Sequence, residues 1–416
     1  MKKITVLVMI LAMVFALAAC GGGNAGSTQS LTPGQQTGQE QTEEPTETPA
    51  NADVKAMDFA VRLFKVSLES GKNTLISPFS VLSALAMTAN GAGGDTLAEM
   101  EAVLGMSLDE LNAYIKAYSD SLPVGEKYKL DPANSIWFNS RDSFSVNEDF
   151  IKKIAANYDA DIFKADFDDA TLKDINDWVK GKTDGMIPEI LDQISPDAVM
   201  YLINALAFEA EWIEPYFEDQ VHESEFTTED GTKEKVDLMY SEENTYLESE
   251  NATGVIKYYK EGKYAFAALL PKEGTTVEEL VESLDGAKLQ KILADRQNTT
   301  TYTAIPKFET EYGTEMSRVL MGMGMPLAFD PANADFSNLG TAGENVFIGR
   351  VIHKTFISVA EQGTRAGAAT IVEMLEGAAL MEEEPKEVIL DRPFVYMLID
   401  CETYTPFFIG TLMHVK

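Results

Sequence analysis

The spacing of apolar residues changes from helical to strand-like along the chain. Met57, Val61, Phe64 and Leu68 recur every three or four positions, which predicts an amphipathic helix that stops at Gly71. From about residue 135 onward the apolar runs are shorter and predict strands at 200–208, 264–270, 301–305, 351–360, 395–400 and 407–415. Helices followed by strands, with no βαβ alternation and no repeat period, indicate an α+β domain.

Local signals mark three helix starts in the first part of the chain. Ser77 followed by Pro78 supplies a cap and a first-turn proline for a helix that runs to about residue 90. Two further starts have the capping-box pattern, with Glu three positions after Ser or Thr: Thr96 with Glu99, and Ser107 with Glu110.

The first 52 residues lack the apolar spacing of a folded domain. Lys2 and Lys3, an apolar run over 4–16 and small residues up to Cys20 are typical of an export signal at 1–19. A membrane-spanning helix is the alternative, but 4–19 is shorter than the roughly 20 residues that a bilayer requires. Residues 20–52 are Gly, Ser, Thr, Gln, Glu and Pro-rich, which predicts a disordered tether with a span of roughly 30 Å, and the domain then covers 53–416.

The residues Leu17, Ala18, Ala19 and Cys20 resemble the bacterial lipoprotein signal. That resemblance implies a lipid on Cys20 and an exported, extracytoplasmic protein anchored to the bacterial cell membrane. Cys401 is the second of two cysteines, so a lipidated Cys20 leaves it without an intrachain disulfide partner and predicts a structural thiol.

Charge excludes several classes of partner. Lys and Arg number 33 against 67 Asp and Glu, which gives a formal net charge of −34. Phosphate polymers are repelled by such a chain, and no basic run follows the N-terminus. The sequence therefore predicts neither a nucleic-acid nor a heparin-like partner.

Catalytic motifs are absent from the sequence. The three histidines, His222, His353 and His414, accompany neither a G-x-S-x-G elbow nor an H-E-x-x-H pair. The glycine-rich stretch 91–96 lacks the lysine of a phosphate-binding loop, and the acidic run 382–384 lacks the ligand spacing of a calcium loop. We expect no enzyme activity, no cofactor and no metal.

The segment 361–376 has an unusual composition of small residues. By itself the stretch Glu361 to Thr370 is compatible with a flexible linker or a weak helix. As an extended strand, however, it has one face without charge, formed by Thr364, Ala366, Ala368, Thr370, Val372 and Met374. The opposite face is formed by Arg365, Gly367, Ala369, Ile371 and Glu373. Such a segment can enter a half-buried sheet without burying a charge.

Glu361, Gln362, Gly363 and Thr364, followed by alanines and glycines, resemble the reactive-loop hinge of inhibitory serpins. Other motifs similar to this family occur in family order between residues 53 and 416. They are Asn73, Ser77, Pro78 and Ser80; Gly91, Ala92, Gly94 and Thr96; Ile175, Asn176, Trp178 and Val179; Asn204 and Trp212; Ile305, Pro306, Lys307 and Phe308; His353; Arg392, Pro393 and Phe394; and Phe408, Ile409 and Gly410.

The resemblance implies a serpin fold, with an N-terminal helical region, large mixed and antiparallel sheets and an exposed reactive loop at about 361–391. It implies a monomeric suicide-substrate inhibitor whose cleaved loop enters the main sheet and traps a serine protease as a covalent acyl-enzyme. The hinge residues are Glu361, Gly363, Thr364, Ala366, Ala368 and Ala369. The family's shutter corresponds to Ser77, Ser80, Asn204 and His353, and its breach to Trp212. Ordinary buried hydrogen bonding, or a catalytic base at His353, are the rival interpretations of the shutter residues.

The scissile bond follows from the family's count of seventeen residues from the hinge glutamate. The count places the bond between Gly377 and Ala378, with Glu376, Ala379 and Leu380 as alternates because the loop is longer than usual. Small side chains there predict an elastase-like or subtilisin-like target, while cleavage after Glu376 predicts a glutamate-specific protease. A non-inhibitory serpin acting as a surface carrier or adhesin, and an inert scaffold, remain the alternatives.

Overall fold

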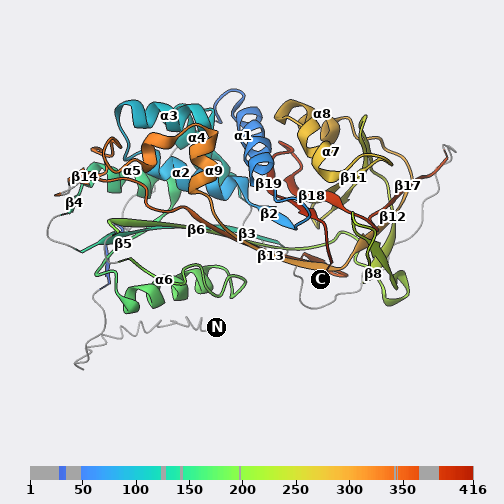
Figure 1. The fold of residues 1–416 in the computed structure, drawn as a ribbon. Helices are drawn as coiled ribbons and strands as arrows, with labels where there is room; N and C mark the ends of the chain where they lie inside the picture. The colour runs from blue at the N-terminus through green and yellow to red at the C-terminus, as the bar shows by residue number, and fades with distance from the viewer. Residues whose placement is uncertain are drawn as a thin grey trace, which may run out of the picture.

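A computed structural model of the chain describes residues 28–33, 48–122, 128–140, 144–195, 198–341, 343, 345–364 and 384–415. Helices cluster in the first part of the chain and recur between the strands of the second (Figure 1). The helices are α1 (Ala52–Ser67), α2 (Pro78–Ala89), α3 (Gly94–Leu104), α4 (Leu108–Ser121), α5 (Glu148–Tyr158), α6 (Asp169–Lys182), α7 (Val277–Ser283), α8 (Gly286–Ala294) and α9 (Ser317–Met323), with short 3-10 turns η1 (Glu218–Gln220) and η2 (Pro326–Phe329).

In the described residues the strands form three large sheets and one small one. In spatial order the seven-stranded sheet contains β1 (Gln29–Ser30), β5 (Asp161–Ala165), β3 (Tyr128–Asn139), β6 (Met200–Glu211), β16 (Gly363–Thr364), β15 (Ile352–Ala360) and β13 (Phe308–Glu315). The six-stranded sheet contains β2 (Thr74–Ile76), β19 (Pro406–Leu412), β18 (Phe394–Asp400), β11 (Tyr264–Pro271), β10 (Ala252–Tyr258) and β9 (Tyr246–Glu248). The four-stranded sheet contains β17 (Lys386–Ile389), β12 (Thr301–Pro306), β8 (Lys233–Glu243) and β7 (Val221–Thr227), and β14 (Gly340–Thr341) pairs with β4 (Ser145–Val146). This is the α+β architecture that the sequence predicts, with helices first and large mixed and antiparallel sheets after them.

The seven-stranded sheet is covered on both faces. α6 packs on one face, where Ile175 and Val179 contact Ile203 and Ala205 of β6. The other face of β6 joins the main core through residues such as Leu206 and lies beneath α2 (Figure 1). Because both faces are buried, β6 reads as a nearly unbroken apolar run instead of an alternating one.

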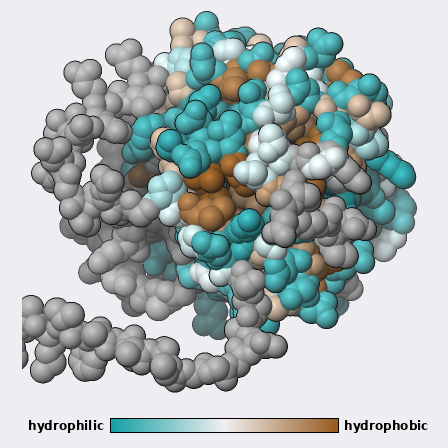
Figure 2. All heavy atoms as spheres, turned by 90° about the vertical axis from the view of Figure 1, so that its left-hand side faces the viewer, coloured by the Kyte–Doolittle hydropathy of each residue, from teal (hydrophilic) through white to brown (hydrophobic). Residues whose placement is uncertain are grey.

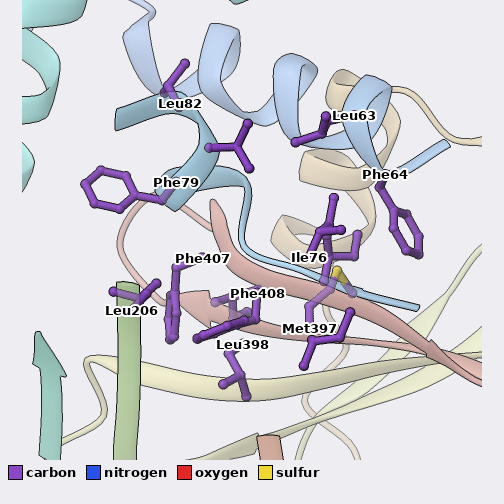
Figure 3. Packing of buried hydrophobic residues seen from close by; sticks show 14 of the residues in the cluster. Leu63, Phe64, Ile76, Phe79, Leu82, Leu206, Met397, Leu398, Phe407 and Phe408 are labelled. Carbon is purple, nitrogen blue, oxygen red and sulfur yellow. The ribbon is translucent and has the colours of Figure 1, made fainter. Parts of the chain in front are cut away.

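The main core lies between the first helices and the six-stranded sheet. Figure 3 shows Phe64 of α1 and Phe79 of α2 on the helix side of this core, and Leu398 of β18 and Phe408 of β19 on its sheet side. All four side chains are at most 6% exposed. This packing holds α2 in place against β6, in the middle of the seven-stranded sheet.

Two of the three predicted helix starts are confirmed. The Ser77 hydroxyl caps α2 by accepting from the backbone N–H of Ser80, and the capping box of Ser107 is complete at α4. The capping box at Thr96 is wrong, because α3 begins earlier, at Gly94. The Thr96 hydroxyl instead accepts a hydrogen bond from the backbone of Asp335. This contact with a residue distant in sequence takes the place of the predicted capping contact with Glu99.

The predicted strands are present, with small differences at their ends. β19 ends at Leu412, three residues before the predicted end, and α1 ends at Ser67, four residues before Gly71. The predicted disordered tether is wrong over part of its length, because Gln29 and Ser30 form β1 at the edge of the seven-stranded sheet. Backbone hydrogen bonding to a free strand edge orders this polar stretch without an apolar core of its own.

In the part of the chain that the structure describes, none of the helices is both long and apolar enough to cross a bilayer. The predicted export signal at 1–19 lies outside the described residues. The described residues also contain no cluster of acidic, histidine or cysteine side chains arranged to hold a metal ion.

Candidate functional site

The seven-stranded sheet has a very short strand at its centre. β16 contains only Gly363 and Thr364, whereas its neighbours β6 and β15 have 12 and 9 residues. Thr364 pairs antiparallel with Ala210 on one side and with Val359 on the other. Beyond β16, β6 and β15 lie next to each other but share no ladder among the described residues. We call this line, between residues 200–209 and 352–358, the seam.

Gly363 and Thr364 are fixed tightly at the end of the seam. Gly363 has a φ of 152°, and a Cβ there would lie 2.0 Å from the carbonyl oxygen of Ala210. Only glycine fits this close approach. The side chain of Thr364 points inward, is 2% exposed, and its hydroxyl lies 2.5 Å from the Tyr259 hydroxyl.

Trp212 holds the turn between β15 and β16. Its ring stacks on Tyr259 at 4.4 Å between centroids and 8° between planes. Its indole N–H donates to the carbonyl of Ala360 at 2.9 Å, and its backbone N–H donates to the carbonyl of Gln362 at 2.9 Å. Trp212, which the sequence predicts for the breach, is therefore in direct contact with the predicted hinge segment.

Glu361 links the hinge to Lys307, between β12 and β13, and to Tyr216, after β6. Its carboxylate accepts a hydrogen bond from Lys307 Nζ at 2.6 Å, and its backbone carbonyl accepts from the N–H of Tyr216 at 2.9 Å. Burial works to raise the pKa of Glu361, but the hydrogen bond and charge of Lys307 outweigh it and hold the pKa below its ordinary value. The carboxylate is thus charged whenever the hinge is docked near neutral pH.

A buried lysine, Lys257, lies over the ring of Trp212. The side chain of Lys257 is 2% exposed and pairs with Glu243 at 2.5 Å. Its ammonium lies 4.5 Å from the ring centroid of Tyr216 and 5.7 Å from that of Trp212. A cavity of about 680 Å³ opens beside this cation. These contacts give Lys257 a cation–π role that fixes the rings of Trp212 and Tyr216.

The predicted shutter residues come together beneath the seam. His353 of β15 is fully buried, and burial lowers its pKa to about 4, so the imidazole is neutral at pH 7. Its Nε2 accepts a hydrogen bond from the backbone N–H of Ser77 at 3.0 Å. The hydroxyl of Ser77 is used as the cap of α2, so this pair lacks the hydroxyl–imidazole contact of a catalytic serine and histidine.

A chain of polar side chains continues from α2 across the sheet. The Ser80 hydroxyl contacts the side-chain oxygen of Asn204 on β6, and Asn204 donates to Asn134 on β3. The amide of Asn134 in turn donates to the carbonyl of Tyr158 at 2.9 Å. A cavity of about 30 Å³ lies between Ser80, Asn204 and His353, where the seam crosses α2. The cluster ties α2 to both strands that border the seam.

Several predicted site residues are outside the described residues. They are Ala366, Ala368 and Ala369 of the hinge, Glu376, Gly377, Ala378, Ala379 and Leu380 of the reactive site, and Cys20. Cys401, the free cysteine of the described part, is half-buried after β18, and burial raises its pKa to about 12. That thiol is protonated and unreactive at neutral pH.

The two ends of the loop lie in different sheets. The loop leaves the seven-stranded sheet after Thr364 and re-enters the structure at β17, where Lys386 pairs parallel with Thr301 of β12. The residues that sequence reasoning missed, Tyr259, Lys257 and Asn134, contact predicted residues but are distant from them in sequence. A single tyrosine or asparagine in a strand carries no motif that identifies it.

Comparison with known proteins gives one consistent family. The family model described as "Serpin (serine protease inhibitor)" matches residues 54–415. An uncharacterized serpin-like protein of Thermococcus kodakarensis is 32% identical over 86% of this chain and 84% of its own length. Leukocyte elastase inhibitor A of Rattus norvegicus is 27% identical over 85% of this chain and 96% of its own. The native state of tengpin, a thermophilic serpin, superimposes with a TM-score of 0.83 and 46% identity, covering 88% of this chain and 95% of that one.

Proposed function

The chain belongs to the serpin family, and from this premise we propose that it inhibits serine proteases as a suicide substrate by inserting its cleaved loop into the seam. Members of this family are mainly protease inhibitors and not enzymes. The observation that carries the proposal is β16, a two-residue strand that already occupies the entrance of the seam and pairs with both of its borders.

The register of β16 determines where an inserted loop would lie. Thr364 is opposite Ala210, and β16 runs antiparallel to β6, so each further loop residue lies opposite the preceding residue of β6. Residue 374 would then lie opposite Met200, the first residue of β6. Ten inserted residues at about 3.3 Å each would extend the strand by roughly 33 Å, along the whole length of the seam.

The inward face of the inserted strand fits the side chains already present. Because Thr364 points into the core, Ala366 and Ala368 would follow it on the same face, opposite Phe208 and Leu206. Both alanines add little volume beside these large side chains. Thr370 would lie opposite Asn204, where its hydroxyl can join the polar shutter cluster.

The other face of the inserted strand would lie on the α6 side of the sheet. There Ile371 falls opposite Ile203, which contacts α6. Arg365 falls opposite Glu209, and opposite charges on paired strands are favourable. On both faces, the side chains of the inserted loop would therefore be compatible with the side chains of β6 opposite them.

The reaction requires only the target's own catalytic serine. Its Oγ attacks the carbonyl carbon of Gly377, the peptide bond to Ala378 breaks, and the new amino group of Ala378 leaves with the proton supplied by the target's histidine. The acyl ester then holds the protease on Gly377 while the loop inserts. Insertion draws the ester away from its original position, and a distorted active site no longer positions water for deacylation.

Small side chains around the bond support an elastase-like or subtilisin-like target, since a shallow primary pocket accepts them. A glutamate-specific protease is the runner-up if cleavage follows Glu376. Incubation with elastase, subtilisin and trypsin should give a complex that survives denaturing electrophoresis with the first two. The released C-terminal peptide should begin at Ala378 by mass, whereas a peptide that begins at Gly377 would favour the runner-up. A stable complex with trypsin alone would contradict the proposal.

Thr364→Arg tests insertion directly. An arginine cannot be buried opposite Tyr259 without a partner, so the loop should be cut and released without a stable complex. The control, Glu373→Arg, puts the same side chain on the opposite face and should still form the complex. If Thr364→Arg behaves like the unmodified protein, a carrier or scaffold role replaces the inhibitory one.

We also propose that the protein is exported and anchored through a lipid on Cys20, on the strength of the small-residue stretch that ends at this cysteine. Growth with a radiolabelled fatty acid should label the protein, and Cys20→Ala should abolish the label. Cys401→Ala, which removes the other thiol, should leave it unchanged. Equal labelling of the Cys20→Ala protein would contradict the anchor.

A further inference from the structure

A segment of the predicted tether is docked on the domain. Gln29 and Ser30 pair antiparallel with Lys164 and Phe163 of β5. The next residue, Leu31, donates its N–H to the carbonyl of Ile162 at 2.7 Å and packs against the main core.

Side chains on both sides of β1 add to the docking. The hydroxyl of Thr32 accepts from the N–H of Ile162 at 2.9 Å, and the hydroxyl of Thr28 donates to Asp174 of α6 at 2.7 Å. β5 would otherwise present an unpaired edge. The segment 28–32, which we call the docking strand, therefore contacts both the sheet and the helix that covers it.

The docking strand lies at the end of the molecule opposite β16 and β17, the strands on either side of the loop. Phe163, its partner, pairs with Trp137, which pairs with Tyr201 of β6. Thr364 pairs with Ala210, nine residues further along the same strand, or about 30 Å away. In Figure 1, β5 is at the left end and β17, where the loop returns, is at the right end.

We propose that the docking strand orients the anchored domain, with its reactive loop pointing away from the lipid surface. This inference rests on the proposed lipid at Cys20. Only residues 21–27 separate that cysteine from Thr28, and seven residues span at most about 25 Å. The end of the domain that carries β5 is thereby held near the bilayer, and Thr364 and Lys386, the described residues on either side of the loop, lie toward the far end.

Attraction to the lipid does not supply this orientation. The chain has a net charge of −34, which anionic headgroups repel. The coloured surface at this end of the molecule is mostly hydrophilic with separate hydrophobic patches in Figure 2, unlike the broad apolar face of a protein that lies in a membrane. The short link to the docking strand is thus the feature that sets the direction of the domain.

The docking itself can be tested on soluble protein that begins at Gly21 and has no lipid. In Thr28→Ala/Leu31→Pro/Thr32→Ala, the docking strand loses its helix contact, a backbone donor and an acceptor. Amide exchange at Ile162 should become about tenfold faster or more. The matched control, Thr37→Ala/Gln41→Pro/Thr42→Ala, should exchange at the original rate. Equal protection in all three proteins would overturn the docking.

Orientation can be tested independently of lipidation in the cell. Protein that begins at Cys20 and carries Cys401→Ser is coupled to maleimide-bearing phosphatidylcholine vesicles. A donor dye is introduced through an azide side chain at Glu148, on the anchored end, or at Glu387, on β17. Energy transfer to an acceptor lipid should be clearly stronger from 148 than from 387, and the docking-strand variant should reduce the difference. Equal transfer from both positions in the unmodified protein would overturn the proposal, whereas failure of fatty-acid labelling would overturn only the anchor.

Discussion

At the scale of single residues, the hinge is held by contacts that leave no room for other side chains. Gly363 lies against the backbone of Ala210, and the hydroxyl of Thr364 meets that of Tyr259. The side chains of Glu361 and Lys307 are each about one-third exposed, so their ion pair fixes the position of Glu361 but contributes little to stability. Small size at 363 and correct polarity at 364 are therefore the properties that allow the hinge to dock.

Gly363→Ala should expel the hinge, because the added methyl would lie 2.0 Å from the Ala210 carbonyl oxygen in a backbone region that alanine avoids. Exchange at the amide of Trp212, which donates to Gln362, should accelerate, and more loops should be cut for each protease trapped. Gly349→Ala is the control, since a Cβ there meets no atom within 4 Å. Unchanged exchange at Trp212 would show that the hinge is not held in this way.

His353 should make the native state sensitive to mild acid. Its pKa is about 4 when folded and near 6.5 when unfolded, so the unfolded chain takes up the proton first as the pH falls below 6.5. The free energy of unfolding should then decrease by about 2 to 3 kcal/mol between pH 7 and pH 4.5 through this residue alone. His353→Gln removes the titration and should show a decrease smaller by that amount in urea unfolding. An equal decrease in the free energy of unfolding with pH in both proteins would contradict this prediction.

At the scale of elements, the seam depends on α2 as much as on the two strands that border it. Ser77 reaches β15 through His353, and Ser80 reaches β6 through Asn204. α2 therefore bridges the strands that must part before a loop can enter. Any movement of β6 away from β15 has to break or exchange these hydrogen bonds.

Asn204→Ala should destabilise the protein by about 2 to 3 kcal/mol, since it leaves the buried side chains of Ser80 and Asn134 without this partner. Asn333→Ala, which removes an exposed asparagine bonded to Asp330, should cost under about 0.5 kcal/mol. Chemical unfolding of both variants would measure the difference. Equal effects would mean that the cluster is not energetically linked across the sheet.

Elements differ in how far the sequence predicted them. β6, β11 and β18 are buried on both faces, and their continuous apolar runs were visible in the sequence. β7 and β8 were not predicted, because their exposed positions carry charges and their apolar positions are few. The hinge was predicted from its small residues and alternation. Its partner Tyr259 was not, because a contact across 105 positions leaves no local pattern.

At the scale of the whole molecule, the seven-stranded sheet contains a two-residue strand, β16, between two much longer ones, and the proposed insertion would complete it from the same chain. The loop is connected to two different sheets, so it cannot extend β16 fully while both connections are intact. Cleavage removes that restriction. On the proposed insertion, the folded state before cleavage is not the most stable arrangement that the chain can reach.

Cleavage of the loop should raise the Tm by about 20 °C, because about ten residues would each gain net hydrogen bonding of roughly 1 kcal/mol, and each kcal/mol is worth about 2 °C in a chain of this size. Scanning calorimetry before and after cutting by a protease that is not trapped would measure the change. Cleaved Thr364→Arg protein should gain much less. An unchanged Tm in the cleaved original protein would exclude insertion.

The docking strand limits the space for a protease that has been carried to the end of the inserted loop. With residue 374 opposite Met200, Gly377 would end about 10 Å beyond β6, at the same end as β1 and near the bilayer. A captured enzyme of ordinary size is about 40 Å across, wider than the 25 Å that seven residues can bridge. We expect capture to displace the docking strand, which would lengthen the free chain between Cys20 and the domain. Newly accessible residues 28–33 would then mark inhibitors that have been used, and limited proteolysis there, before and after complex formation on vesicles, would detect them.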